Sequence, residues 1–301
     1  MMSDRNPTIF VTGATGQLGR RVISQLLTRT PAASIVAGVR SLDNGLARDF
    51  EARGVEVRTI DYSLPETLVS AFKDVDRILL ISSSSMTDRV GQHGNVIEAA
   101  RQEGVELIAY TSLLHADTSV LGMADDHLRT EDLLNASGLP FVLLRHGWYT
   151  ENHMESVPTA IKYGAVLGAA GGGRFSTATR QDFAEAAATV LTSENQAGLT
   201  YELAGDDAYT LGDLAGAIAD ATGREIVYRD MPEGEFRDTL RKLGLPEPLA
   251  ELIANADAAA AKGALEDHSH QLSDLIGRPT TPLDVTLAET LREIGKGKAQ
   301  G

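Results

Sequence analysis

The sequence contains no cysteine. That absence excludes disulfides, thiolate nucleophiles, iron–sulfur clusters and cysteine-ligated zinc together. Any redox chemistry therefore has to be carried by a bound cofactor. The polar start, Met1–Pro7, lacks the basic and apolar parts of an export signal. Together with the missing cysteine, it leads us to expect a cytoplasmic protein.

Long apolar runs are missing too. None approaches the ~20 residues that a membrane-spanning helix needs, so no membrane role is expected. The 27 basic residues are outnumbered by 42 acidic ones, which gives a net charge of −15. Such a surface repels phosphate backbones, and nucleic acid is therefore not an expected partner. With 301 residues, 43% of them hydrophobic, the chain can still form one large or two modest globular domains.

What the first half does contain is an alternation of short apolar runs with helical patterns. Strands are predicted at residues 8–12, 34–39, 55–60, 78–81, 107–111 and 141–145, with helices between them, among them 17–27, 95–102 and 127–135. Strands separated by helices form βαβ units, and near-continuous apolar strands fit a sheet covered on both faces. We predict an α/β fold in which residues 1–150 form a Rossmann-type, doubly wound parallel sheet.

Residues 151–301 are predicted to form a smaller, mainly helical cap that is interleaved with the sheet. Residues 160–173 are rich in glycine and alanine and indicate a loop. Helices are predicted over 182–191, 211–221 and most of 233–265, with a short strand at 199–203. Thr210, followed three residues later by Asp213, predicts a capping box at the start of the middle helix.

A glycine-rich turn joins the first predicted strand to the first helix. It consists of Gly13, Ala14, Thr15, Gly16, Gln17, Leu18 and Gly19. Gly13 permits a tight turn, Gly16 lets the backbone approach a pyrophosphate, and Gly19 permits close packing of helix and strand. The helix N-terminus would offer free N–H groups to the phosphates. The turn predicts a dinucleotide site, and its GxxGxxG spacing resembles the short-chain dehydrogenase/reductase superfamily.

Three further positions at strand ends fit such a cofactor. Arg40 ends the second strand, where a guanidinium would bind the 2′-phosphate of NADP(H); the alternative is an ordinary surface arginine. Asp61 follows the third strand and would either accept a hydrogen bond from the adenine amino group or cap the helix near Pro65. Ser82, Ser83 and Ser84 follow the fourth strand and would either approach the nicotinamide half or form a flexible loop.

Lysine is scarce: only six of the 27 basic residues are lysines. None has a tyrosine four residues before it, and none stands between positions 74 and 161, so the Tyr-x-x-x-Lys unit of ordinary short-chain dehydrogenases is absent. His127 and Glu131 stand where that helix is expected, either as a catalytic pair or as a pair on the helix surface. An alkoxide needs a strong proton donor as it forms, so an ordinary ketone reductase is disfavoured.

A quinone acceptor needs less acid catalysis than a ketone does. Hydride addition to a quinone gives a phenolate-like anion with a pKa near that of tyrosine, ~10, which can take its proton from water or from a weak donor. Positioning the acceptor over the nicotinamide then supplies most of the rate. The missing lysine is therefore compatible with a quinone reductase.

Several longer segments carry a family resemblance: GATGQLG (13–19), LLISSS (79–84), IAYTSLLHADT (108–118), LLRHGWYTEN (143–152) and Lys262-Gly263. They resemble the NmrA-like atypical short-chain dehydrogenases over almost the whole chain. Within that family they are most similar to the bacterial NADPH:quinone oxidoreductases, which are related to triphenylmethane reductase. The resemblance implies NADPH-dependent reduction of quinones by direct hydride transfer, without flavin.

The resemblance also implies a second group of site residues after the sixth strand. Gly147, Trp148, Tyr149 and Asn152 would line the nicotinamide pocket, and the last three of them would contact the acceptor. Tyr149 is the candidate proton donor. The alternative is that the two aromatic residues fill the junction between the domains, and Arg145 is interpreted as structural or as a phosphate contact.

Two other functions stay open. NmrA-like proteins include NADP-binding sensors with little or no turnover, and the acceptor could instead be another conjugated molecule such as a triphenylmethane dye. His268 and His270 are expected to be solvated, because no third ligand stands at a suitable spacing for a metal. The sequence is compatible with a homodimer.

Overall fold

The structure, a computed structural model, describes the backbone of residues 6–299 and the side chains of residues 6–296. Residues 1–5, which belong to the polar start considered above, lie outside the described residues. The chain forms two compact units, each assembled from separate stretches. The first unit comprises residues 6–116, 125–146 and 180–201, and the second comprises 117–124, 147–179 and 202–299. The expected boundary is a single cut at residue 150, whereas the chain passes between the units several times.

A seven-stranded sheet forms the centre of the first unit. Its strands are β1 (Ile9–Val11), β2 (Ile35–Val39), β3 (Glu56–Thr59), β4 (Arg77–Leu80), β5 (Leu107–Leu113), β6 (Phe141–His146) and β9 (Thr200–Leu203). Their order is β3-β2-β1-β4-β5-β6-β9, and all pairs from β3 to β6 are parallel. In the centre of the sheet, Val11 lies opposite Ala37 of β2 and Leu79 of β4. This arrangement confirms the predicted Rossmann-type fold.

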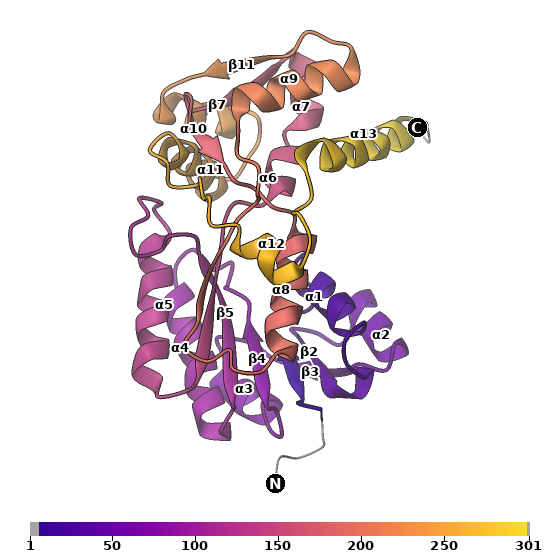
Figure 1. Cartoon of the computed structure of the whole chain (residues 1–301), viewed down its shortest axis with the longest axis vertical. Coiled ribbons are helices and arrows are strands. Elements are labelled where there is room, and N and C mark those ends of the chain that lie inside the picture. The colour runs from indigo at the N-terminus through magenta and orange to yellow at the C-terminus, as the bar shows by residue number, and fades with distance from the viewer. Residues whose placement is uncertain (1–5, 300–301) are drawn as a thin grey trace. The chain divides into compact units, whose positions relative to one another are not determined.

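Helices cover both faces of this sheet. They are α1 (Gly19–Leu26), α2 (Gly45–Ala52), α3 (Pro65–Ala71), α4 (Arg89–Glu103), α5 (Ala124–Ser137) and α8 (Arg180–Thr192), with a short 3₁₀ turn, η1 (Ala32–Ser34). One core contains Phe10 of β1 together with residues of α3, α4 and α5. Alternate strand residues such as Ile9 and Val11 are buried on the other face. Figure 1 shows α8, which is distant in sequence, lying beside α1.

The second unit is built from short strands and helices. Its elements are α6 (Thr150–Met154), α7 (Val157–Tyr163), β7 (Ala165–Gly168), β8 (Arg174–Phe175), β10 (Tyr209–Thr210), α9 (Leu211–Thr222), β11 (Val227–Asp230), α10 (Glu233–Lys242), α11 (Glu247–Ala260), α12 (Gln271–Ile276) and α13 (Leu283–Ala299). β7 pairs with β11 in parallel, and β8 pairs with β10 in antiparallel orientation. Among residues 6–299 no helix combines the length and the apolar character needed to cross a membrane.

The prediction of a loop over residues 160–173 is wrong in part. Its beginning belongs to α7 and its middle to β7. Gly164, with φ +71°, ends α7 in the left-handed conformation. β7 then pairs with β11, which begins about sixty residues later in the sequence. The capping box is confirmed: the Thr210 hydroxyl accepts from the Asp213 N–H, and the Asp213 carboxylate accepts from the Thr210 N–H.

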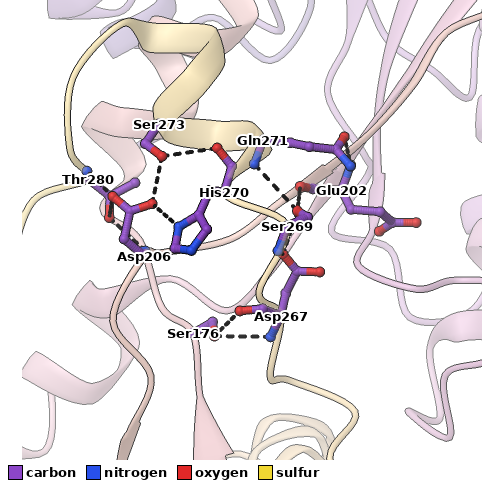
Figure 2. A network of polar contacts seen from close by, with 9 residues as sticks. All are labelled: Ser176, Glu202, Asp206, Asp267, Ser269, His270, Gln271, Ser273 and Thr280. Carbon is purple, nitrogen blue, oxygen red and sulfur yellow. Dashed lines mark hydrogen bonds and ion pairs between the residues drawn. The ribbon is translucent and has the colours of Figure 1, made fainter.

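One carboxylate of the second unit, that of Asp206, binds several groups in and around α12. Asp206 accepts hydrogen bonds from Ser273 Oγ at 2.6 Å, from the Thr280 N–H at 2.8 Å and from His270 Nδ1 at 3.0 Å. Figure 2 shows these groups converging on Asp206, with Ser269 and its neighbours beside them. His270 adopts φ +56°, a left-handed conformation that is uncommon outside glycine.

A buried carboxylate holds the turn after β7. Asp257 of α11 is 6% exposed, and its Oδ2 accepts from the Ala169 N–H at 2.9 Å. The next two N–H groups of the turn donate to Tyr228 Oη at 3.1 Å and to Asp230 Oδ1 at 2.9 Å. Burial raises the pKa of Asp257 to about 7, against the opposing hydrogen bond from Ala169, and the charge of Asp230 raises it further.

Candidate functional site

The first unit contains a cavity of about 620 Å³ at the carboxyl ends of β1, β2, β3 and β4. It is lined by Gly13, Thr15, Gly16, Gly38, Val39, Arg40, Ile60, Asp61, Tyr62, Ser63, Ile81, Ser82, Ser83, Ser84, Ser85 and Gln92. From β1 the next strands, β2 and β3, are added on one side, whereas β4, β5 and β6 are added on the other side, so the switch point lies between β1 and β4. Ligands of open α/β sheets bind at such a switch point. The size lies in the range of small-molecule and cofactor sites.

The glycine turn follows β1 and forms one wall of the cavity. Gly13 has φ +56°, and its carbonyl oxygen accepts from the Gly16 N–H at 2.9 Å, which closes a tight turn. A Cβ on Gly19 would lie 2.3 Å from the Gly13 oxygen and 2.7 Å from Ala14 Cα. Glycine is therefore required at position 19, because α1 begins against the backbone of the turn. The bare backbone of Gly13 and Gly16 fits the approach of a pyrophosphate.

Arg40 carries the one positive charge in the lining. It directly follows β2, its side chain is exposed, and it has no hydrogen bond or ion pair within the described part of the chain. β2 is tied to the glycine turn by the Ala14 N–H, which donates to the Gly38 oxygen at 3.1 Å. The guanidinium thus lines the same cavity as the turn with its donors unused, as a 2′-phosphate site requires.

Asp61 and Tyr62 form the cavity wall after β3. Asp61 Oδ1 accepts from the Ser63 N–H at 2.8 Å, and α3 is capped by no side chain, so Asp61 does not cap that helix. Tyr62 was not among the predicted site residues. Its hydroxyl lies 2.5 Å from Thr12 Oγ1 and 2.9 Å from the Ile81 oxygen, and burial raises its pKa. Its position next to Asp61 at a strand end is the sequence feature that would mark it as a candidate.

The serine turn, residues 82–85, lies after β4 and forms the opposite rim. Ser82 N–H donates to Thr111 Oγ1 at 2.8 Å, and Ser85 N–H donates to Ser83 Oγ at 3.0 Å. Ser83 Oγ in turn donates to Gln92 of α4, a further lining residue that sequence reasoning missed. The turn is therefore held by specific hydrogen bonds, and its contact with the nicotinamide half stays a prediction.

Eight of the predicted cofactor residues line this cavity, and eight do not. Ala14 and Leu18 are buried beneath the turn, whereas Gln17 is exposed; Gly19 supports the turn as described. Gly147, Trp148, Tyr149 and Asn152 belong to the second unit. All four are half-buried, and the backbone oxygen of Trp148 accepts from the Ala178 N–H at 3.2 Å. Their assigned contacts with the nicotinamide and the acceptor remain predictions.

His127 and Glu131 do not form a pair on the helix surface. They are 2% and 5% exposed, and each bonds to a different partner. His127 Nδ1 lies 2.8 Å from the Tyr110 hydroxyl, and burial lowers the pKa of His127 to about 3. Glu131 forms an ion pair with Arg145 at 2.7 Å. This ion pair favours the structural interpretation of Arg145 over that of a phosphate contact.

The histidines near the C-terminus each contact a carboxylate. His268 Nε2 lies 3.5 Å from Glu266 Oε1, and His270 contacts Asp206. Within the described residues, no group of three or more His, Asp or Glu side chains is arranged to hold a metal ion.

A doubly wound sheet with a glycine turn, an unpaired arginine and a cavity at its switch point defines a Rossmann-type dinucleotide-binding protein. The chain belongs to the NAD(P)H-binding family, whose model matches residues 13–194. It is 48% identical to quinone oxidoreductase 2 of Escherichia coli over 286 residues, which cover 95% of this chain and 98% of that protein.

Two solved structures extend the comparison. A crystal structure of an NADPH-dependent quinone oxidoreductase from Escherichia coli in complex with NADPH matches with a TM-score of 0.92 and 47% identity, covering 94% of this chain and 99% of that one. Triphenylmethane reductase of Citrobacter sp., complexed with NADP(H), matches with a TM-score of 0.90 and 38% identity over 94% of this chain and 99% of the other.

Proposed function

We propose that this protein reduces quinones with NADPH by direct hydride transfer. The observation that carries the proposal is the 48% identity, over nearly the full length of both chains, to quinone oxidoreductase 2 of Escherichia coli. The cavity in the first unit supports it independently, because its lining offers the groups that a phosphorylated dinucleotide needs.

The described residues of the first unit fit NADPH. Gly13, Thr15 and Gly16 would hold the pyrophosphate, where the two glycines leave the backbone open to it, and the Arg40 guanidinium would bind the 2′-phosphate. Asp61 would accept from the adenine amino group. The serine turn would contact the nicotinamide half. Bound NADPH supplies the hydride, and no flavin is required by this scheme.

The chain's own contribution to the reaction is chiefly positioning. A quinone that has accepted a hydride carries a phenolate-type charge with a pKa of ~10, so it can be protonated by water or by a weak acid. Tyr149 is the proposed donor, and Trp148 and Asn152 the proposed contacts of the acceptor. The segment 124–137, which forms α5, contains no lysine that could lower a tyrosine pKa. The arrangement favours an acceptor that needs little acid catalysis.

The decisive experiment follows loss of the near-ultraviolet absorbance of NADPH with benzoquinone as acceptor. Rapid quinone-dependent oxidation is expected, with one hydroquinone formed for each NADPH consumed. Tight binding of NADPH without any quinone-dependent oxidation would contradict the proposal and favour a sensor. The same assay with a triphenylmethane dye tests the second candidate, which the match to triphenylmethane reductase favours. A cytoplasmic location, a homodimer and the absence of nucleic-acid binding stay predictions.

A further inference from the structure

Helix α4 presents a row of polar side chains toward the loops at the cavity. Gln92 Nε2 donates to Ser63 Oγ at 3.1 Å, and Asn95 Nδ2 donates to the Tyr62 oxygen at 2.8 Å. Arg89 and His93, one turn apart on the same helix, reach the serine turn instead. The helix thus contacts both rims of the cavity through side chains that lie three and four residues apart.

His93 is the group beneath the serine turn. It is 0% exposed, and its Nε2 lies 2.8 Å from the Ser83 backbone nitrogen. A backbone N–H can only donate, so Nε2 must be the acceptor and must carry no proton. The proton of the neutral ring is therefore on Nδ1, which lies 2.9 Å from Thr130 Oγ1. The Thr130 hydroxyl donates a hydrogen bond to the Asp126 backbone oxygen at 2.8 Å, so each polar group in this series of hydrogen bonds has a partner.

Arg89 completes the support. Its Nε donates to the Ser83 oxygen at 3.0 Å, and its Nη1 lies 3.2 Å from Asp126 Oδ2. Both backbone polar groups of Ser83, its N–H and its carbonyl oxygen, are thereby bound by side chains of α4. Burial lowers the pKa of His93 to about 3, and the charge of Arg89 lowers it further, which agrees with a neutral acceptor.

We infer that His93 is a positioning residue for cofactor binding: its neutral, Nδ1-protonated ring fixes the serine turn so that the turn can contact the nicotinamide half of NADPH. The inference rests on the proposed function for the identity of the ligand. It assigns His93 no contact with the cofactor and no role in proton transfer. The adenosine half would lie on the opposite rim, around Arg40 and Asp61, and its binding should not depend on this residue.

The test compares two ligands on three variants. NADPH contains both halves of the cofactor, whereas adenosine 2′,5′-bisphosphate contains only the half assigned to Arg40. In His93→Leu, the Ser83 N–H loses its buried acceptor, and NADPH should bind about tenfold more weakly, with the bisphosphate within about twofold of wild type. His93→Gln places an amide oxygen near the former Nε2 and should restore most of the NADPH affinity.

His127→Leu is the matched control, since His127 is an equally buried histidine of the same unit that bonds to Tyr110 instead of the serine turn. The ring of His127 lies against Tyr110, which His93 also contacts, but it has no hydrogen bond to the serine turn. Both affinities should therefore stay within about twofold of wild type. If His93→Leu does not fold, Thr130→Val removes the group that fixes the tautomer while keeping the side-chain volume, and it should weaken NADPH in the same selective way.

Three results would overturn the inference: unchanged NADPH binding in His93→Leu, equal loss of both ligands in a folded variant, or no recovery in His93→Gln. Amide hydrogen exchange of residues 82–85 without ligand gives a separate readout, because His93→Leu should speed exchange there and His127→Leu should not. A wild-type protein that binds no NADPH would refute the proposed function, while the exchange measurement would still decide whether His93 holds the turn.

Discussion

Glu131 and Arg145 form a buried, two-pronged ion pair. Arg145 Nε lies 3.0 Å from Glu131 Oε1, Nη2 lies 2.7 Å from Oε2, and the side chains are 10% and 6% exposed. Ser112 Oγ donates to the same carboxylate at 2.5 Å. The pair therefore fastens α5 to β5 and β6. Its burial makes the loss of one partner costly, since the other charge would remain without compensation in a poorly solvated site.

Arg145→Met should lower the free energy of unfolding by about 3–5 kcal/mol, because it leaves the Glu131 carboxylate buried and unpaired. Urea denaturation followed by circular dichroism measures the loss. Arg101→Met is the control: Arg101 pairs with Glu98 on α4, but both side chains are about half exposed, and little change is expected. A similar loss in both variants would show that burial does not decide the effect.

Gly19→Ala adds only one methyl group but should impair cofactor binding strongly. The added Cβ would lie 2.3 Å from the Gly13 oxygen, so the turn has to move, and NADPH affinity should fall at least about tenfold. Calorimetric titration gives the affinity. Gly216→Ala, in the open interior of α9, meets nothing within 4 Å and should instead raise stability by up to about 1 kcal/mol. Unaltered NADPH binding in Gly19→Ala would refute the assigned role of the turn.

Arg40→Ala should change the choice of cofactor. Without the guanidinium, the 2′-phosphate loses a charge-assisted contact, so NADPH should bind about 10- to 100-fold more weakly while NADH changes little. The ratio of the two dissociation constants is the measurement. Arg53→Ala is a suitable control, because Arg53 is an exposed arginine of the same unit that pairs with Asp49 and does not line the cavity. An equal loss for both cofactors would mean that Arg40 does not bind the 2′-phosphate.

Much of the first unit could be predicted because its strands are short apolar runs with sharp ends. The predicted strands 34–39 and 141–145 match β2 and β6 to within one residue. Gly104, with φ +70°, ends α4 in the left-handed conformation that glycine adopts readily. The glycine turn, Arg40 and the serines all follow such strands. Parallel strands bring their carboxyl ends to one edge of a sheet, so their mutual proximity could be inferred without coordinates.

What could not be predicted depends on contacts distant in sequence. The sequence predicts a loop where β7 forms, because this segment is rich in glycine and alanine and its partner strand, β11, begins only about sixty residues later. His127 and Glu131 share one helix face, but helical spacing does not reveal whether that face meets solvent or a sheet. Their partners, Tyr110 and Arg145, lie on strands of that sheet. His93 likewise gave no signal, since its partner is a backbone N–H that any sequence could provide.

The contact between Asp206 and His270 should depend on pH. The Asp206 hydrogen bond raises the pKa of His270 against the opposing effect of desolvation, and the charges of Asp206, Asp274 and Asp267 raise it further. Burial raises the pKa of Asp206, but hydrogen bonds from Ser273, His270 and Thr280 outweigh it, so its pKa is lowered. The stabilisation of the folded state by His270 is therefore present below about pH 6.5 and is lost as the pH rises through the folded pKa of this histidine.

His270→Asn tests this without disturbing the backbone, since asparagine tolerates the left-handed conformation at φ +56°. The melting temperature of the variant should lie below that of wild type near about pH 5.5, and the two should converge near about pH 9. A difference between His270→Asn and wild type that is constant with pH would refute the ionic contribution.

Asp257 should act in the opposite direction. Its folded pKa of about 7 lies above the ~3.9 of an unfolded aspartate, so the folded state binds more protons between these values. Stability must then fall as the pH rises from about 4 to 7. Asp257→Asn retains an oxygen to accept from the Ala169 N–H but cannot ionise. We expect it to raise the free energy of unfolding by about 2–4 kcal/mol at about pH 8.5 and to have little effect at about pH 4.5. Urea titrations at both pH values measure this difference. Destabilisation by Asp257→Asn at the higher pH would mean that the charged carboxylate, not the neutral one, is the form that holds the turn after β7.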